Sequence, residues 1–251
     1  MSLFNSSSPA LNDKVFEAAR SASLTTDSVM TVRGAIHKTL LLLLLAVLGA
    51  SYTWQMFASA ANPTAAVTPY MVGGLVGGLV FSLIAIFRPR SSTWAAPLYA
   101  VCEGLCLGAL SAMFDAQTNG IVLQAVGLSV GVLFLMLVLY RTGAIKVTDK
   151  LRGGIIIATG AIALFSVVTW IVGMFTSVTF MYDASPLSIG ISVFVVIIAA
   201  LNFLMDFDFI DRGAQMSLPK YMEWYGAFGL MLTLVWLYLE MLRLLSKLNK
   251  R

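Results

Sequence analysis

Five carboxylic acids lie in or beside long apolar stretches of this sequence, where charged groups are costly. Asp206, Asp208 and Asp211 close one apolar run, and Glu240 and Glu103 each interrupt another. An ionised carboxylate in hydrocarbon costs roughly several kcal/mol unless it finds water or a partner, so each acid is a candidate functional group. Carboxyl oxygens bind protons and hard cations such as Ca²⁺, so we expect proton or cation chemistry here.

Asp206 lies deeper than Asp208 and Asp211, and Glu240 lies deeper still inside the last run. If they face each other inside a helix bundle, they share one proton near neutral pH, because two adjacent charges cannot both form cheaply. The protonated pair would lock two helices together, whereas the doubly ionised pair would repel, admit water and offer oxygen ligands to Ca²⁺. The sequence therefore predicts a pH-gated cation site with Asp206 and Glu240 as its Ca²⁺ ligands.

Local partners allow a different interpretation of three of these acids. Arg243 follows Glu240 at i+3, so these two side chains can form an ion pair of their own. Asp208 and Arg212 are likewise related as i and i+4 on a continuing helix. On this interpretation, Asp208 and Asp211 form a solvated, cytosolic helix end.

Two further polar residues extend the candidate cation path, to which Asp208 could also contribute. Glu103 could add an oxygen ligand or a second step, or it could be a neutral, hydrogen-bonded acid that holds the bundle together. Asn202 lies one turn before Asp206, at i−4, so its amide is expected to donate a hydrogen bond to that carboxyl group.

The composition of the chain is typical of a membrane protein. Of its 251 residues, 59% are hydrophobic and 11% are charged, whereas soluble domains carry roughly 25% charged residues. Apolar runs of about 20 residues can cross a bilayer as helices. The predicted runs are Thr39–Phe57, Pro69–Phe87, Trp94–Phe114, Ile121–Tyr140, Gly154–Phe175, Pro186–Asp206 and Trp224–Leu245. We therefore expect an all-α membrane protein with a seven-helix domain over residues 34–251, preceded by a polar cytosolic tail over residues 1–33.

The distribution of Lys and Arg predicts the orientation of these helices. Basic residues precede the first run and recur in every second loop, while the loops between have none. Because cytoplasmic loops carry an excess of Lys and Arg, the N-terminus is expected in the cytosol. Arg243, Lys247, Lys250 and Arg251 break the pattern, since seven crossings place the C-terminus outside. The last segment either crosses against the rule, which parity favours, or re-enters and returns to the cytosol.

Small residues indicate how the helices associate. Paired glycines at 73–74 and 77–78, and the repeat of Gly104 and Gly108 in the next run, permit close helix contact in lipid. Cys102 and Cys106 lie four residues apart in an apolar run without further ligands nearby, so we expect small buried apolar groups rather than a metal site.

Other classes of protein are disfavoured. His37 is the only histidine and lies at the predicted membrane edge, which disfavours a metalloenzyme. The Gly-x-Gly-Asp element of intramembrane aspartyl proteases is missing, and the second acid here would be a glutamate. Basic residues are dispersed, without the basic aromatic-bearing face of a nucleic-acid-binding protein. We expect no enzymatic activity, no cofactor and no nucleic-acid partner.

Three segments around the acids carry a resemblance to a known family. They are Leu204–Ile210 in the sixth run, Leu237–Leu242 in the seventh and Glu103–Gly108 in the third. With these segments the chain resembles, over roughly residues 35–248, the Bax inhibitor family of transmembrane BAX inhibitor-motif proteins, and in particular its bacterial branch. The resemblance implies a seven-helix bundle with the last helix at its centre. It also implies a pH-sensitive Ca²⁺ leak governed by a paired-acid latch between helices six and seven.

Carried over to this sequence, the latch consists of Asp206 and Glu240. Glu240 departs from the family pattern, which has aspartate at that position, and its side chain is one methylene longer. The segment between the two acids is also longer than in better-known members, with residues 216–225 as the extra part.

Two functions remain open from the sequence. The first is a pH-sensitive Ca²⁺ leak in the cell membrane of a bacterium, with the bilayer, Ca²⁺ and H⁺ as its partners. The alternative is a membrane protein that transports nothing and modulates a partner, such as a quality-control protease or a cell-death regulator.

Overall fold

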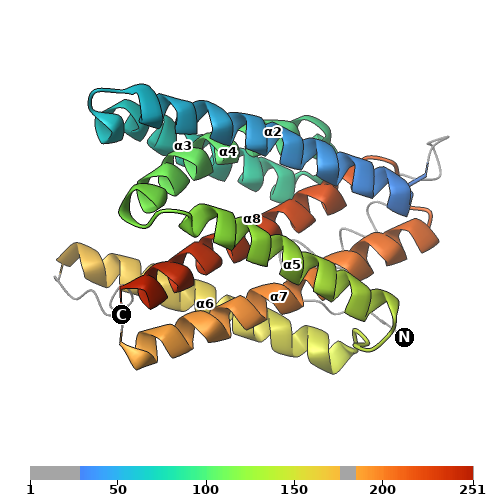
Figure 1. Ribbon diagram of the computed structural model, residues 1–251. Coiled ribbons are helices and arrows are strands. Elements are labelled where there is room, and N and C mark those ends of the chain that lie inside the picture. Colours follow the sequence, from blue (N-terminus) through green and yellow to red (C-terminus); the bar gives the residue numbers. More distant parts are fainter. Residues whose placement is uncertain (1–28, 176–184, 251) are drawn as a thin grey trace. The chain divides into compact units, whose positions relative to one another are not determined.

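The computed structural model describes residues 29–175 and 185–250, which form seven long helices (Figure 1). The helices are α2 (Val32–Ser59), α3 (Pro63–Phe87), α4 (Ser92–Gln117), α5 (Ile121–Arg141), α6 (Asp149–Phe175), α7 (Pro186–Gln215) and α8 (Met222–Asn249). The short 3-10 helix η1 (Pro89–Ser91) joins α3 to α4. All seven long helices are sufficiently long and apolar to cross a membrane. The predicted seven-helix, all-α fold is confirmed.

Several helices are longer than the apolar runs that predict them. The first begins at Val32, where the Thr31 side chain caps it by accepting a hydrogen bond from the Gly34 amide (2.9 Å). Helix α7 has 30 residues and is about 45 Å long, so it exceeds the roughly 30 Å hydrocarbon core. It continues through the acidic cluster to Gln215. The sequence predicts that Asp206 ends the sixth helix. In the structure it lies inside that helix.

The chain divides into two compact units, and α7 and α8 each contribute to both. The first unit combines the chain up to Gln117 with Asp208–Leu232, and the second combines Thr118–Phe207 with Thr233–Arg251. Among the acids of interest, Glu103 and Asp208 belong to the first unit. Asp206 and Glu240 belong to the second.

Glycines bring α4 close to α2 and α3 in the first unit. A Cβ atom on Gly104 would overlap the backbone of Ala46 in α2, and one on Gly74 would overlap the carbonyl oxygen of Cys102 in α4. Such close approach is the usual role of small residues at helix contacts in lipid. The predicted role is confirmed for Gly74 and Gly104 but not for Gly73, where a Cβ atom would meet nothing within 4 Å. Cys102 is a free cysteine at this contact.

The residues before α2 are held by the loop between α7 and α8 in the first unit. Val29 forms an antiparallel bridge with Pro219, and the amide of the buried Met30 donates a hydrogen bond to the Leu218 carbonyl oxygen (2.6 Å). This loop falls within residues 216–225, which the family resemblance predicts to be longer in this chain. The predicted tail falls largely outside the described residues, but its last few residues are ordered against this loop.

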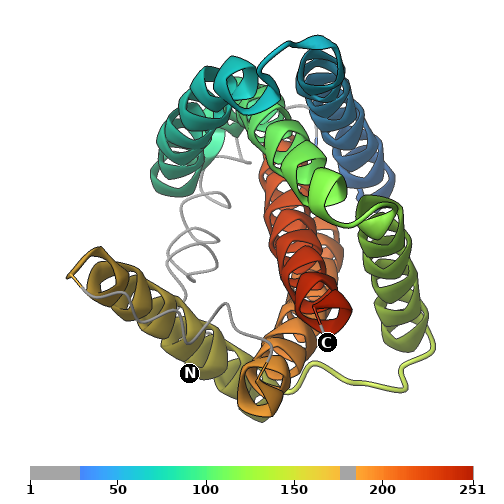
Figure 2. The same ribbon diagram turned by 60° about the vertical axis from the view of Figure 1, so that its left-hand side comes forward.

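Helices α7 and α8 run side by side in opposite directions in the second unit (Figures 1 and 2). Lys247 near the end of α8 donates to the Ser192 hydroxyl near the start of α7 (2.7 Å). At the other end of this contact, Thr233 donates to the Asp206 carboxyl group. Ser192 and Asp206 are fourteen residues apart on α7, and Thr233 and Lys247 are fourteen residues apart on α8. A single antiparallel register therefore accounts for both contacts.

Candidate functional site

Asp206 is a carboxyl group inside α7 whose hydrogen bonds are incomplete. The buried Thr233 of α8 donates one hydrogen bond to it. Its Oδ2 oxygen is inaccessible to solvent and has no hydrogen-bond partner among the described residues. A buried carboxyl oxygen without a partner carries a full desolvation penalty when ionised. The surroundings of Asp206 would therefore only partly stabilise its charge.

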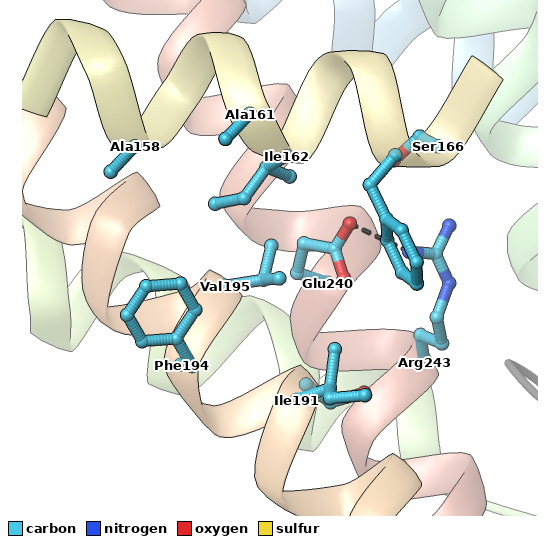
Figure 3. A pocket seen from close by; sticks show the side chains of 11 residues that line it. Ala158, Ala161, Ile162, Ser166, Ile191, Phe194, Val195, Glu240 and Arg243 are labelled. Atoms are coloured by element: carbon cyan, nitrogen blue, oxygen red, sulfur yellow. Dashed lines mark hydrogen bonds and ion pairs between the residues drawn. The ribbon is translucent and has the colours of Figure 1, made fainter. Parts of the chain in front are cut away.

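Glu240 has a partner of its own in α8. Arg243 Nη1 donates to Glu240 Oε1 at 2.6 Å, the i, i+3 pair that the sequence offers as an alternative (Figure 3). The glutamate is 6% exposed, while the arginine side chain is 34% exposed. The pair places a neutralised carboxylate inside the second unit and directs the guanidinium toward its edge.

The structure does not bring Asp206 and Glu240 together as the predicted latch requires. Asp206 bonds to Thr233, and Glu240 lies seven residues further along α8, which is about 10 Å on a helix. In the observed register, the small residue Ala199 of α7 stands level with Glu240. Helix register is the physical reason: a one-residue error shifts a side chain by 100° and 1.5 Å, and it cannot be obtained from either helix alone.

A cavity of about 300 Å³ adjoins the Glu240–Arg243 pair (Figure 3). Its walls are mainly alanine, isoleucine, valine and phenylalanine side chains of α6 and α7, with Ser166 and Ser192 among them. Glu240 and Arg243 are the lining residues from α8. The cavity thus combines an apolar wall with one ion pair.

Asn202 does not serve the Asp206 carboxyl group, contrary to prediction. Its amide donates instead to the Thr159 hydroxyl of α6 (2.9 Å) and to the Ile198 carbonyl oxygen of its own helix (2.8 Å). The i−4 spacing places Asn202 near Asp206, but its side chain can equally turn away and contact a neighbouring helix. Asn202 therefore holds α6 against α7.

The two other aspartates of α7 make local contacts in the first unit. Arg212 Nε donates to Asp208 Oδ1 (3.0 Å), the predicted i, i+4 pair, and Gln215 donates to Asp211 Oδ2 (3.0 Å). Asp208 is 8% exposed. The expectation of a solvated end is therefore wrong for Asp208, because the chain beyond it continues as helix and is itself packed.

Glu103 lies where α4 meets α3 in the first unit. Its Oε2 atom stands 2.9 Å from the position that a Cβ atom on Gly78 would occupy, so the glycine makes room for the carboxyl group. Glu103 is only partly buried. Its suggested part in a cation path remains a prediction.

Sequence reasoning missed a buried acid at the start of α8. Glu223 is 1% exposed and accepts hydrogen bonds from the amide (2.9 Å) and hydroxyl (3.0 Å) of Thr31. It also forms an ion pair with Lys38 of α2, whose ammonium group lies over the Trp224 ring (5.4 Å to its centroid). The available signal was weak: an acid in the first turn of a helix suggests only a favourable helix dipole.

Sequence reasoning also missed Lys247. This side chain is 3% exposed and donates to the Ser188 carbonyl oxygen (3.3 Å) and the Ser192 hydroxyl. The available signal was spacing: Thr233, Glu240 and Lys247 recur every seven residues, which places them on one face of α8. This face of α8 is the one that contacts α7, through Thr233 and Lys247.

Within the described residues, no three His, Cys, Asp or Glu side chains are placed to hold a metal ion together. A Ca²⁺ ion at Asp206 or Glu240 would need most of its six to eight oxygen ligands from water and backbone carbonyls.

Comparison with known proteins covers almost the whole chain. No curated protein matches it. A model of the family described as Bax inhibitor 1 like matches residues 7–250, a range that includes every helix and every acid described above. With the seven apolar helices, this match indicates an integral, multi-pass membrane protein. The chain belongs to the Bax inhibitor 1 like family.

Proposed function

We propose that this protein is a pH-sensitive cation leak that passes Ca²⁺ across its membrane, with Asp206 and Glu240 as the acids that govern passage. The observation that carries the proposal is the solvent-inaccessible Oδ2 atom of Asp206, which lies inside an apolar helix and has no hydrogen-bond partner in the described part of the chain. A carboxyl group in this position is stable as a neutral acid, or when water or a cation reaches it. Membership of the Bax inhibitor 1 like family supports this proposal, because the resemblance to that family implies a pH-sensitive Ca²⁺ leak.

Protonation of Asp206 is the proposed closing event. The neutral acid can remain in contact with Thr233 and keep α7 against α8. Loss of the proton leaves a charge that one hydroxyl donor only partly stabilises, so the site must admit water or a cation. Passage should therefore increase as the pH rises through the range in which Asp206 ionises, and decrease as the pH falls.

Glu240 contributes a second carboxylate, whose charge Arg243 neutralises in the observed conformation. A cation that uses Glu240 as a ligand has to compete with the guanidinium. We propose that this competition keeps cation binding weak, as a leak requires, because a tightly held ion would not leave.

The test is Ca²⁺ flux into liposomes that contain the full-length protein, measured over a series of pH values. The wild type should pass more Ca²⁺ as the pH increases, and Asp206→Asn should lose this dependence because its amide cannot ionise. Asp211→Asn is the matched control, since it makes the same change on the same helix at a residue that contacts Gln215. It should behave as the wild type.

Two outcomes would reject the leak. One is a wild-type protein that passes no Ca²⁺ at any pH, and the other is an Asp206→Asn variant with an unchanged pH profile. If flux is missing while a stoichiometric protein partner co-purifies with both proteins, the modulator function takes the place of the leak.

A further inference from the structure

The cavity between α6, α7 and α8 differs in character from one end to the other. Its lining on α6 extends from Ala158 to Ser166, which are eight positions, or about 12 Å, apart along the helix. Ala158 and Phe194 lie at one end in the close view, and Arg243 lies beside Ser166 at the other (Figure 3). The lining is therefore apolar on the side of Ala158 and Phe194, and the guanidinium of Arg243 lies toward the opposite side.

The cavity faces the outside of the second unit. Phe165 and Phe194, which line it, are 41% and 53% exposed. Both belong to helices that are long and apolar enough to cross a membrane, so their surroundings are lipid rather than water. An acyl chain is the occupant that can reach an apolar cavity from this side.

Arg243 is suited to hold an anionic head group at the charged end. Its pair with Glu240 uses one of the five N–H donors of a guanidinium group, and a third of its side chain is exposed. It lies six residues, or about 9 Å, before the end of α8 at Asn249. Because this 28-residue helix is about 42 Å long, the guanidinium can reach the head-group level of a bilayer with a 30 Å core.

We propose that this cavity binds one anionic phospholipid, with an acyl chain along the apolar wall and the phosphate on Arg243. The volume of about 300 Å³ is at the lower limit for specific small-molecule sites and suits part of one chain. Arg binds phosphate through two parallel N–H donors, and Arg243 keeps further N–H donors beside the one that contacts Glu240. The site does not depend on the proposed leak.

The test is native mass spectrometry of the full-length protein released from micelles containing equal amounts of phosphatidylglycerol and phosphatidylcholine. The wild type should retain one phosphatidylglycerol in preference to phosphatidylcholine. Arg243→Gln should lower this retention about tenfold, the loss expected for one charge-assisted contact. Ala161→Phe should abolish it by filling the cavity while leaving the ion pair intact.

Matched controls separate the site from general effects on the membrane domain. Arg212→Gln removes another arginine that pairs with an acid on its own helix and that is not one of the residues lining the cavity. Ala163→Phe enlarges an exposed residue of α6 that does not line the cavity. Both controls should retain the lipid as the wild type does. Excess glycerol phosphate should not displace it, because the acyl chain supplies part of the binding.

The proposal is overturned if the two phospholipids are retained equally, or if Ala161→Phe binds phosphatidylglycerol as the wild type does. Displacement by glycerol phosphate alone would also reject it, in favour of a simple phosphate site. If Arg243→Gln fails to fold, Ala161→Phe and its control still decide the question.

Discussion

Glu223 and Asp206 are buried acids in opposite situations. Glu223, at the start of α8, is contacted by both donors of Thr31 and by the ammonium group of Lys38. Asp206, inside α7, has one hydroxyl partner, and its second oxygen has none among the described residues. The first carboxylate is stabilised as an anion within its own unit, and the second is not.

The comparison indicates that burial alone does not identify a functional acid in this protein. A fully paired carboxylate costs little to keep charged but leaves no oxygen for an ion, so Glu223 is suited to holding the start of α2 against α8. An incompletely paired carboxyl group is less stable and can exchange a proton or bind a cation. The difference between the two sites lies in their donors rather than in their depth.

Lys38→Met should give the largest change in the free energy of unfolding, because it removes the ion-pair partner of Glu223. It leaves Glu223 buried with only the Thr31 donors, so we expect a loss of about 3 kcal/mol in the free energy of unfolding. Unfolding of the purified protein in mixed micelles with increasing denaturing detergent measures this. Lys220→Met, at an exposed loop position, is the control and should change stability by less than about 0.5 kcal/mol. Equal effects of the two variants would show that the Glu223 contacts are not structural.

Gly34→Ala should have a smaller effect at the same site. A Cβ atom there would overlap the Glu223 carboxyl group, so the acid must move from its donors. We expect a loss of about 2 kcal/mol, in the range for overfilled sites. Gly127→Ala in α5, where a Cβ atom meets nothing, should instead stabilise the protein by about 0.5 kcal/mol through helix propensity. The same detergent unfolding series compares the two variants. If both changed the free energy of unfolding in the same direction, the interpretation would be contradicted.

The smallest expected effect is the coupling between Asp206→Asn and Glu240→Gln. It tests whether Asp206 interacts directly with Glu240. The two acids have separate partners and lie about two helical turns apart in register, so their effects on unfolding free energy should add within about 0.5 kcal/mol. A direct latch predicts clear non-additivity. A double-mutant cycle on stability, repeated on Ca²⁺ flux, decides between them. Strong coupling in flux alone would mean that the acids meet in another conformation.

Features that depend on local sequence were predicted well. Seven apolar runs and the glycine repeats of the second and third runs correspond to observed helices and helix contacts. The Asp208–Arg212 pair and the Glu240–Arg243 pair follow from i, i+4 and i, i+3 spacing. In both ion pairs the partners lie on one helix, whose geometry is known in advance.

Features that join distant segments were not predicted. Thr233 as the partner of Asp206, Thr159 as the partner of Asn202, and Lys38 as the partner of Glu223 each connect two helices. Apolar helices in lipid can slide and rotate against one another with little change in hydrophobic burial, so composition does not select a register. Close packing of particular side chains does.

The sequence by itself determined that this chain is a seven-helix membrane protein with acids in costly positions, because apolar length and charge are properties of each segment. Only the tertiary structure decided which acids are satisfied. Glu223 receives its donors from residues nearly two hundred positions away, while the α7–α8 register gives Asp206 a single hydroxyl donor among the described residues and leaves Glu240 to pair with Arg243 of its own helix. A buried carboxyl group becomes structural or reactive according to the donors that packing brings to it.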